Sequence, residues 1–178
     1  MTLALSSHLT SITRCLIKER NHLLPRLIKL CQSDDKIAIE FSIQILASLS
    51  KYTQIKDDLA EGLETVASLC ENTDPDIKKH TLSVIINLAN DFTLIGEVAQ
   101  FADLIVPFCI KNLQSQFIQI QQLSMEALYL LCYDKSGFDV FVETHGTNHI
   151  LTYLLNPGIV SDLDLFQFKS IFFVPLNL

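Results

Sequence analysis

Residues 74–89 read DPDIKKHTLSVIINLA, and this stretch has the signals of a helix along its whole length. Asp74 is suited to cap the first turn, and Pro75 fits the first helical position, where its missing N–H costs no hydrogen bond. Apolar side chains then recur with helical spacing at Ile77, Leu82, Ile85, Ile86 and Leu88. The stretch therefore predicts an amphipathic helix of about four turns.

Comparable stretches occur on both sides of this one. Upstream, after Asp34 and Asp35, apolar residues recur every four positions at Ile37, Phe41, Ile45 and Leu49, a helix pattern that a strand would not give. Downstream, after the glutamine-rich segment 114–122 begins, they recur at Ile120, Leu123, Leu128 and Leu131. The sequence thus predicts three long helices of the same kind.

An apolar phrase precedes each long helix and ends in a cysteine. Cys31, Cys70 and Cys109 close these phrases at intervals of 39 residues. Short helical segments are expected after the long helices, at 51–59, 92–101 and 137–142. A period near forty residues made of helices indicates stacked repeats, in which each unit buries its apolar face against its neighbours.

Three helices in a unit of about forty residues is the armadillo arrangement, whereas two would indicate HEAT repeats. Residues 74–89 resemble the third helix of an armadillo repeat, and residues 146–155 resemble the start of one. The resemblance implies an all-α, right-handed superhelical α-solenoid of armadillo/HEAT-like repeats. Its expected parts are a partial repeat or capping helix at 1–22, repeats at 23–62, 63–103 and 104–146, and an incomplete unit with an apolar tail at 147–178.

The same resemblance implies where a ligand would bind. In peptide-binding armadillo proteins the third helices line a concave groove, and an asparagine there holds the backbone of an extended ligand. That asparagine corresponds to Asn87 here, while Ser48 and Leu130 take its place in the other two copies. Nuclear-import adaptors place a tryptophan four residues earlier, and this chain contains none. The candidate groove residues are Gln44, Ser48, Lys79, Ser83, Asn87, Gln122 and Glu126.

Net charge, apolar runs and cysteine content indicate which partners and which cellular compartment to expect. The net charge of −7 argues against nucleic acid, whose binding depends on Lys and Arg neutralising phosphates. No uncharged apolar run is long enough to predict a membrane span. Five cysteines at repeat spacing suit buried thiols in a reducing compartment, either the cytoplasm or the nucleus. For Cys31, Cys70 and Cys109 a role as small buried hydrophobes is expected.

No catalytic motif is recognisable in the sequence, so we do not expect an enzyme. His145 and His149 lie four residues apart, but Gly146 interrupts the segment, and neither a metal nor a cofactor is predicted. The expected function is a non-enzymatic scaffold that binds a protein or an extended peptide along the groove. The alternative is a structural or assembly segment of a larger protein that self-associates through the apolar tail, residues 165–178.

Overall fold

The computed structural model describes residues 14–155, and this part of the chain consists of helices and the turns between them. The elements in chain order are α2 (Arg20–Leu30), α3 (Lys36–Leu49), α4 (Thr53–Ala60), α5 (Leu63–Ser68), the 3-10 turn η1 (Leu69–Glu71), α6 (Pro75–Ala89), α7 (Ile95–Ala99), α8 (Ala102–Asn112), α9 (Ile118–Leu131), α10 (Lys135–Glu143) and α11 (Gly146–Leu154). No helix in this part is long and apolar enough to cross a membrane.

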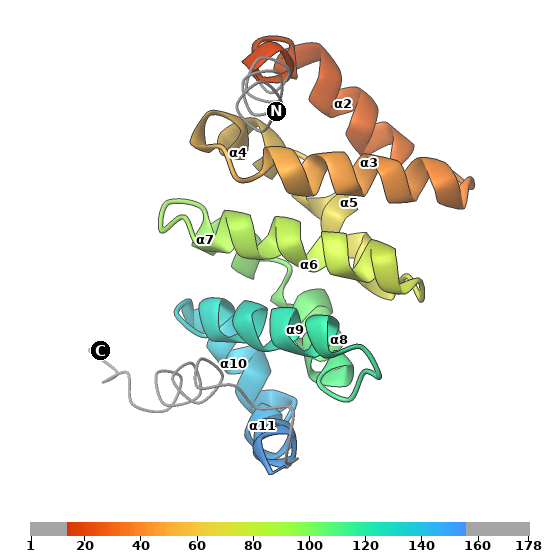
Figure 1. Cartoon of the computed structure of the whole chain (residues 1–178). Coiled ribbons are helices and arrows are strands. Elements are labelled where there is room, and N and C mark those ends of the chain that lie inside the picture. Colours follow the sequence, from red (N-terminus) through yellow and green to blue (C-terminus); the bar gives the residue numbers. More distant parts are fainter. Residues whose placement is uncertain (1–13, 156–178) are drawn as a thin grey trace, which may run out of the picture.

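The three long helices form one layer of the molecule. Figure 1 shows α3, α6 and α9 stacked one beside another with their axes aligned, and α6 packs against both of its neighbours. The shorter helices α5 and α8 lie behind them in a second layer, and α2 packs against α3 at the N-terminal end of the stack. A long helix, a short helix and a second-layer helix thus recur along the stack, which confirms the all-α solenoid predicted from the repeat spacing.

The N-terminal caps of α3 and α6 follow from the sequence signals. The Asp74 carboxylate accepts hydrogen bonds from the backbone N–H of Asp76 and Ile77, at 2.9 and 3.2 Å. The Asp35 carboxylate accepts one from Ile37 at 2.9 Å in the same way. Such caps satisfy N–H groups that have no partner inside the helix. No side chain caps α9, whose N-cap residue Phe117 has an extended backbone.

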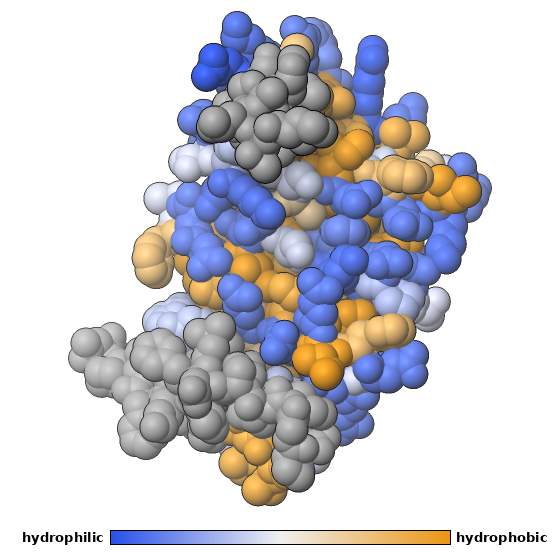
Figure 2. Space-filling view, viewed as in Figure 1, coloured by the Kyte–Doolittle hydropathy of each residue, from blue (hydrophilic) through white to orange (hydrophobic). Residues whose placement is uncertain are grey.

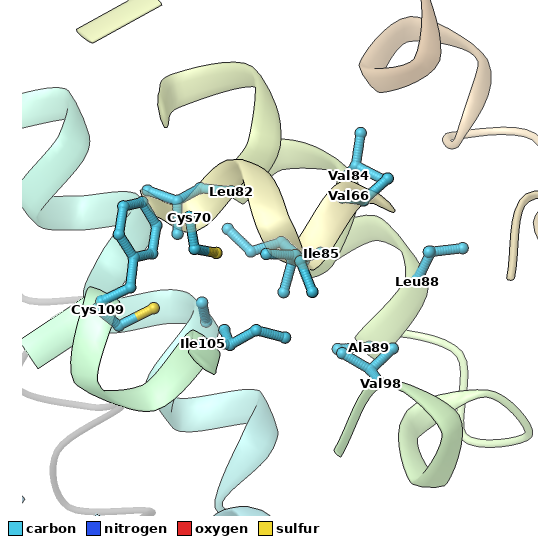
Figure 3. Packing of buried hydrophobic residues seen from close by; sticks show 14 of the residues in the cluster. Val66, Cys70, Leu82, Val84, Ile85, Leu88, Ala89, Val98, Ile105 and Cys109 are labelled. Atoms are coloured by element: carbon cyan, nitrogen blue, oxygen red, sulfur yellow. The ribbon is translucent and has the colours of Figure 1, made fainter. Parts of the chain in front are cut away.

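One apolar core runs through all the units. The apolar residues predicted for α6 are buried, and Figure 3 shows Leu82, Ile85 and Leu88 among core residues of α5, α7 and α8. Cys70 and Cys109 come from neighbouring units and lie in this same core. Since every unit contributes to an interface with the next one, no unit can bury its apolar side chains alone.

Polar contacts between units hold the stack in register. The Lys36 ammonium group lies 2.6 Å from the Asp74 carboxylate, so the start of α3 is tied to the cap of α6. This contact raises the pKa of Lys36 and lowers the pKa of Asp74. In the second layer, the Gln32 side-chain amide donates to the Thr65 hydroxyl at 2.9 Å.

The helix α3 is confirmed, but three of the four residues that indicated it are exposed. Ile37, Phe41 and Ile45 point away from the core, which uses Ile43 and Leu46 instead. The reason is the position of α3 in the stack. Val84 and Ala127, which correspond to Ile45 in α6 and α9, are buried because each has a preceding long helix beside it, and among the described residues α3 has none.

The start and end of the chain lie largely outside the described residues. The helix α11 begins at Gly146, whereas the apolar tail at 165–178 and most of the segment 1–22 are not described. The boundaries proposed for the repeats stay predictions.

The thiols give a direct test of this packing. Burial raises the pKa of Cys31 to about 11 and that of Cys70 to about 12, and it also raises the pKa of Cys109. A thiol reacts as the thiolate, so these three should resist a thiol reagent at pH 8 in the native protein. The exposed Cys15 should react within seconds to minutes, and mass spectrometry of the labelled peptides checks this order. Labelling of Cys70 as fast as Cys15 would contradict the packing.

Candidate functional site

All seven predicted groove residues lie on the three stacked long helices. Gln44 and Ser48 belong to α3, Lys79, Ser83 and Asn87 to α6, and Gln122 and Glu126 to α9. Gln44, Ser48 and Gln122 are exposed, and the other four are half-buried. We call the surface formed by these seven residues the long-helix face. Figure 2 shows a largely hydrophilic surface over these helices, with apolar side chains gathered at the right-hand end of α3.

The helix register places corresponding residues in rows across the long-helix face. Gln44, Ser83 and Glu126 form one row, since they occupy the same position in each copy of the long helix. Adjacent packed helices are about 8–10 Å apart, so a row of three spans about 20 Å. An extended chain rises about 3.3 Å per residue, and six or seven residues of ligand would therefore cross one row.

The two serines of the face bond to their own helices. The Ser48 hydroxyl donates to the Gln44 carbonyl oxygen at 3.0 Å, and the Ser83 hydroxyl donates to the Lys79 carbonyl oxygen at 2.9 Å. Each hydroxyl oxygen keeps lone pairs that can accept a bond. The serines therefore present acceptors to a ligand, while Gln44 and Gln122 present both donors and acceptors.

The amide of Asn87 links two units. Its Nδ2 atom donates to the Ser50 hydroxyl at 2.9 Å and more weakly to the Ala47 carbonyl oxygen at 3.4 Å, both at the C-terminal end of α3. The backbone clamp implied by the armadillo resemblance stays a prediction. With both N–H groups of Asn87 engaged inside the protein, only its Oδ1 atom is available for that role.

This geometry predicts that Asn87→Ala lowers the stability of the protein. The buried Ser50 hydroxyl would lose its partner on α6, and the expected loss in unfolding free energy is about 1 kcal/mol. Urea unfolding followed by circular dichroism measures it. The conservative control Ser48→Ala removes a hydroxyl that bonds only within α3 and should change stability by less than about 0.5 kcal/mol. Equal stability of wild type and the Asn87 variant would contradict the role of Asn87 as a link.

Of the two charged residues on the long-helix face, Lys79 has an ion-pair partner among the described residues and Glu126 has none there. The Lys79 ammonium group lies 2.9 Å from the Asp76 carboxylate one turn earlier on α6. Glu126 has no hydrogen bond or ion pair with any described residue, and it is half-buried. Burial raises the pKa of its carboxyl group, because removing water disfavours the charged form. Among residues 14–155, no cation lies against this carboxylate of the face.

Sequence reasoning missed an aromatic pair at the C-terminal end of the helix that carries Glu126. Tyr129 lies on α9 and Tyr133 two residues after the end of α9, and their rings meet edge to face with centroids 5.1 Å apart. Their hydroxyl groups are 2.5 Å apart, and this bond raises the pKa of Tyr133 to about 12. Continuing the pattern of the face by one turn toward the end of α9 would have found both residues.

Within residues 14–155, no group of three or more His, Cys, Asp or Glu side chains is arranged to hold a metal ion. His145 has a left-handed backbone with φ of 55° and precedes α11, where Gly146 packs against the ring of Phe141. The chain therefore makes a tight turn between α10 and α11.

Solved structures similar to this chain are designed armadillo repeat proteins. One has a TM-score of 0.73 at 16% identity, and the match covers 89% of this chain and 66% of that one. A second, solved in complex with the peptide (KR)4, has a TM-score of 0.72 at 15% identity with the same coverage of both chains. A third, designed for modular peptide recognition, has a TM-score of 0.71 at 14% identity, and the match covers 83% of this chain and 62% of that one.

These likenesses show that the chain has an armadillo-like repeat fold, as the resemblance of residues 74–89 implied. It spans about two thirds or less of the length of these three proteins. By sequence, the chain matches no family model and no curated protein.

Proposed function

We propose that this protein is a non-enzymatic scaffold that binds an extended segment of another protein along the long-helix face. The fold supports a role in protein binding, since solenoids present long continuous surfaces to their partners. The long-helix face offers exposed amides and hydroxyl acceptors on three adjacent helices, which suit the free backbone groups of an extended chain.

Glu126 is the observation that carries the proposal and specifies the ligand. A half-buried carboxylate without a cation is costly, and a Lys or Arg side chain of the ligand would supply the missing charge. Neighbouring Tyr129 adds an aromatic ring that can contact the aliphatic or guanidinium part of such a side chain. The similar designed protein solved with the peptide (KR)4 binds a cationic ligand, which agrees with this choice.

The proposed compartment is a reducing one, the cytoplasm or the nucleus. All five cysteines are free, and three of them are buried as apolar core residues. Cysteines that stay free and take no part in disulfides are typical of proteins in a reducing compartment.

The test is binding of a fluorescent eight-residue peptide of alternating Lys and Arg, followed by anisotropy at low salt. The variant Glu126→Gln should weaken binding about fivefold, because it removes the carboxylate that would pair with a ligand cation. The matched control Glu97→Gln changes an exposed glutamate on α7 and should leave affinity unchanged. Equal losses in the two variants would indicate non-specific attraction to an acidic protein and would contradict the proposal.

The pH dependence has a definite sign. The raised pKa of Glu126 means that its carboxyl group is protonated earlier than an exposed glutamate as the pH falls. Affinity for the cationic peptide should therefore decrease on acidification, and Glu126→Gln should remove this part of the dependence. Burying an unpaired charge destabilises the folded state at neutral pH, so the variant should be at least as stable as the wild type. A variant that is both less stable and unaltered in binding would show that Glu126 serves the fold.

A further inference from the structure

An exposed aromatic residue occurs two or three positions after the end of each long helix. Tyr52 comes after α3, Phe92 after α6 and Tyr133 after α9, at intervals of 40 and 41 residues. Their exposed fractions are 39%, 84% and 46%. Figure 1 shows that the turns after α3, α6 and α9 follow one another along the left-hand edge of the stack. We call these three residues the aromatic edge row; it borders the long-helix face at the C-terminal ends of its helices.

Polar and aromatic contacts hold the turns at Phe92 and Tyr133. The Asp91 carboxylate accepts bonds from the backbone N–H and the hydroxyl of Thr93, at 3.2 and 2.7 Å, and this closes the turn around Phe92. The Lys56 ammonium group of the preceding unit lies 3.6 Å from the same carboxylate. Tyr133 is fixed by its contact with Tyr129. A Phe side chain that is 84% exposed on such a fixed turn leaves a large apolar surface in water, which a partner would cover.

The spacing of the row restricts the conformation of that partner. The turns that carry the rings advance with the stack of long helices, so successive turns are about 8–10 Å apart. A polyproline II helix turns once every three residues and rises about 9 Å per turn, so every third residue faces the same side at this spacing. Same-face residues of a β-strand recur every 7 Å or so, which does not match. An α-helix reaches about 10.5 Å only at every seventh residue and needs further contacts between, where the row has no ring.

The chemistry of the rings fits the same ligand. Aromatic side chains form flat apolar surfaces on which proline rings pack, and polyproline II segments are typically recognised by aromatic-lined grooves. Such a segment has no internal hydrogen bonds, so its carbonyl groups are free to accept from tyrosine hydroxyls. Tyr52 and the pair of Tyr129 with Tyr133 supply those hydroxyls beside the apolar ring of Phe92.

We propose that the aromatic edge row binds a proline-containing polyproline II segment of a partner protein, with a proline at every third position packing on Tyr52, Phe92 and Tyr133. This site differs from the cationic site at Glu126: Tyr129 lies beside both, but Tyr52 and Phe92 take no part in the cationic site.

The experiment uses the full chain and three labelled peptides of equal length and composition. Each peptide has three prolines, which are two, three or four positions apart. The peptide with prolines at every third position should bind best. The variant Phe92→Ala should weaken its binding about tenfold, and Tyr52→Ala should weaken it about fivefold. The control Phe117→Ala removes a ring of 42% exposure from the turn before α9, away from the row, and should have no effect. Tyr133→Phe keeps the ring and removes the hydroxyl, so it should weaken binding less than Tyr52→Ala does.

Three results would overturn this proposal. They are equal binding of all three peptides, equal affinities of the Phe92 and Phe117 variants, and no binding by the wild type up to about 1 mM. Since Phe92 is mostly exposed, its variant should keep the wild-type melting temperature, which separates lost binding from lost folding. Binding of the Lys and Arg peptide to Phe92→Ala with unchanged affinity is the expected sign that the two sites are distinct.

Discussion

Replacing Leu88 by alanine should lower the free energy of unfolding by about 3 kcal/mol, because the change leaves a cavity at the centre of the stack. Leu88 is fully buried on α6, the long helix that packs against both α3 and α9. Leu88 lies in the last turn of α6, and α6 also contacts α7. Little main-chain adjustment can fill the space, since α6 is held on both sides.

This loss of stability should affect all the described helices together. Units that are stable only against their neighbours unfold together, so the variant should show a single transition at lower urea concentration. The matched control Leu104→Ala removes a side chain that is 42% exposed on α8 and should cost less than about 1 kcal/mol. Equal costs for the two leucines would contradict a core centred on α6, and two separate transitions in the wild type would contradict the coupling of the units.

Replacing Gly137 by alanine should also cost about 3 kcal/mol, for the opposite physical reason. A Cβ atom built on Gly137 would lie 2.3 Å from the carbonyl oxygen of Leu131. That oxygen belongs to the last turn of α9, so relief would require a shift of the backbone between α9 and α10. Glycine at this position lets α10 pack closely against the end of the long helix.

Gly96 provides a control of opposite sign. It lies within α7, and a Cβ atom added there would meet nothing within 4 Å. Alanine has a higher helix propensity and fewer unfolded conformations, so Gly96→Ala should stabilise the protein by about 0.5–1 kcal/mol. Thermal unfolding of both variants checks the pair. An unchanged melting temperature for Gly137→Ala would show that the α9–α10 junction is looser than described.

The repeat spacing and the capping residues predicted much of the fold. Asp74 caps α6 as expected, and the cysteines at intervals of 39 residues are buried in equivalent places. These features are local, or they repeat, so one sequence is enough to reveal them. The exposure of Ile37 and Phe41 could not be predicted, because it depends on whether another long helix lies beside α3.

The candidate site was predictable only in part. Helical register was sufficient to place Gln44, Ser83 and Glu126 on adjacent long helices. It did not indicate that the Asn87 amide bonds to Ser50, which lies 37 residues earlier in the chain. Only the packing of α3 against α6 brings these two side chains together. Tyr52, Phe92 and Tyr133 recur at intervals that the sequence does contain, but their exposure is a property of the folded turns.

Nuclear magnetic resonance titration with the eight-residue peptide of Lys and Arg tests the central claim most directly, that three stacked long helices form one binding surface. We expect the resonances of Gln44 on α3, Ser83 on α6 and Gln122 on α9 to shift together, along curves that give one dissociation constant. Resonances of the second-layer helices α5 and α8 should stay in place. Shifts confined to those second-layer helices, or different dissociation constants for the three long helices, would contradict the claim.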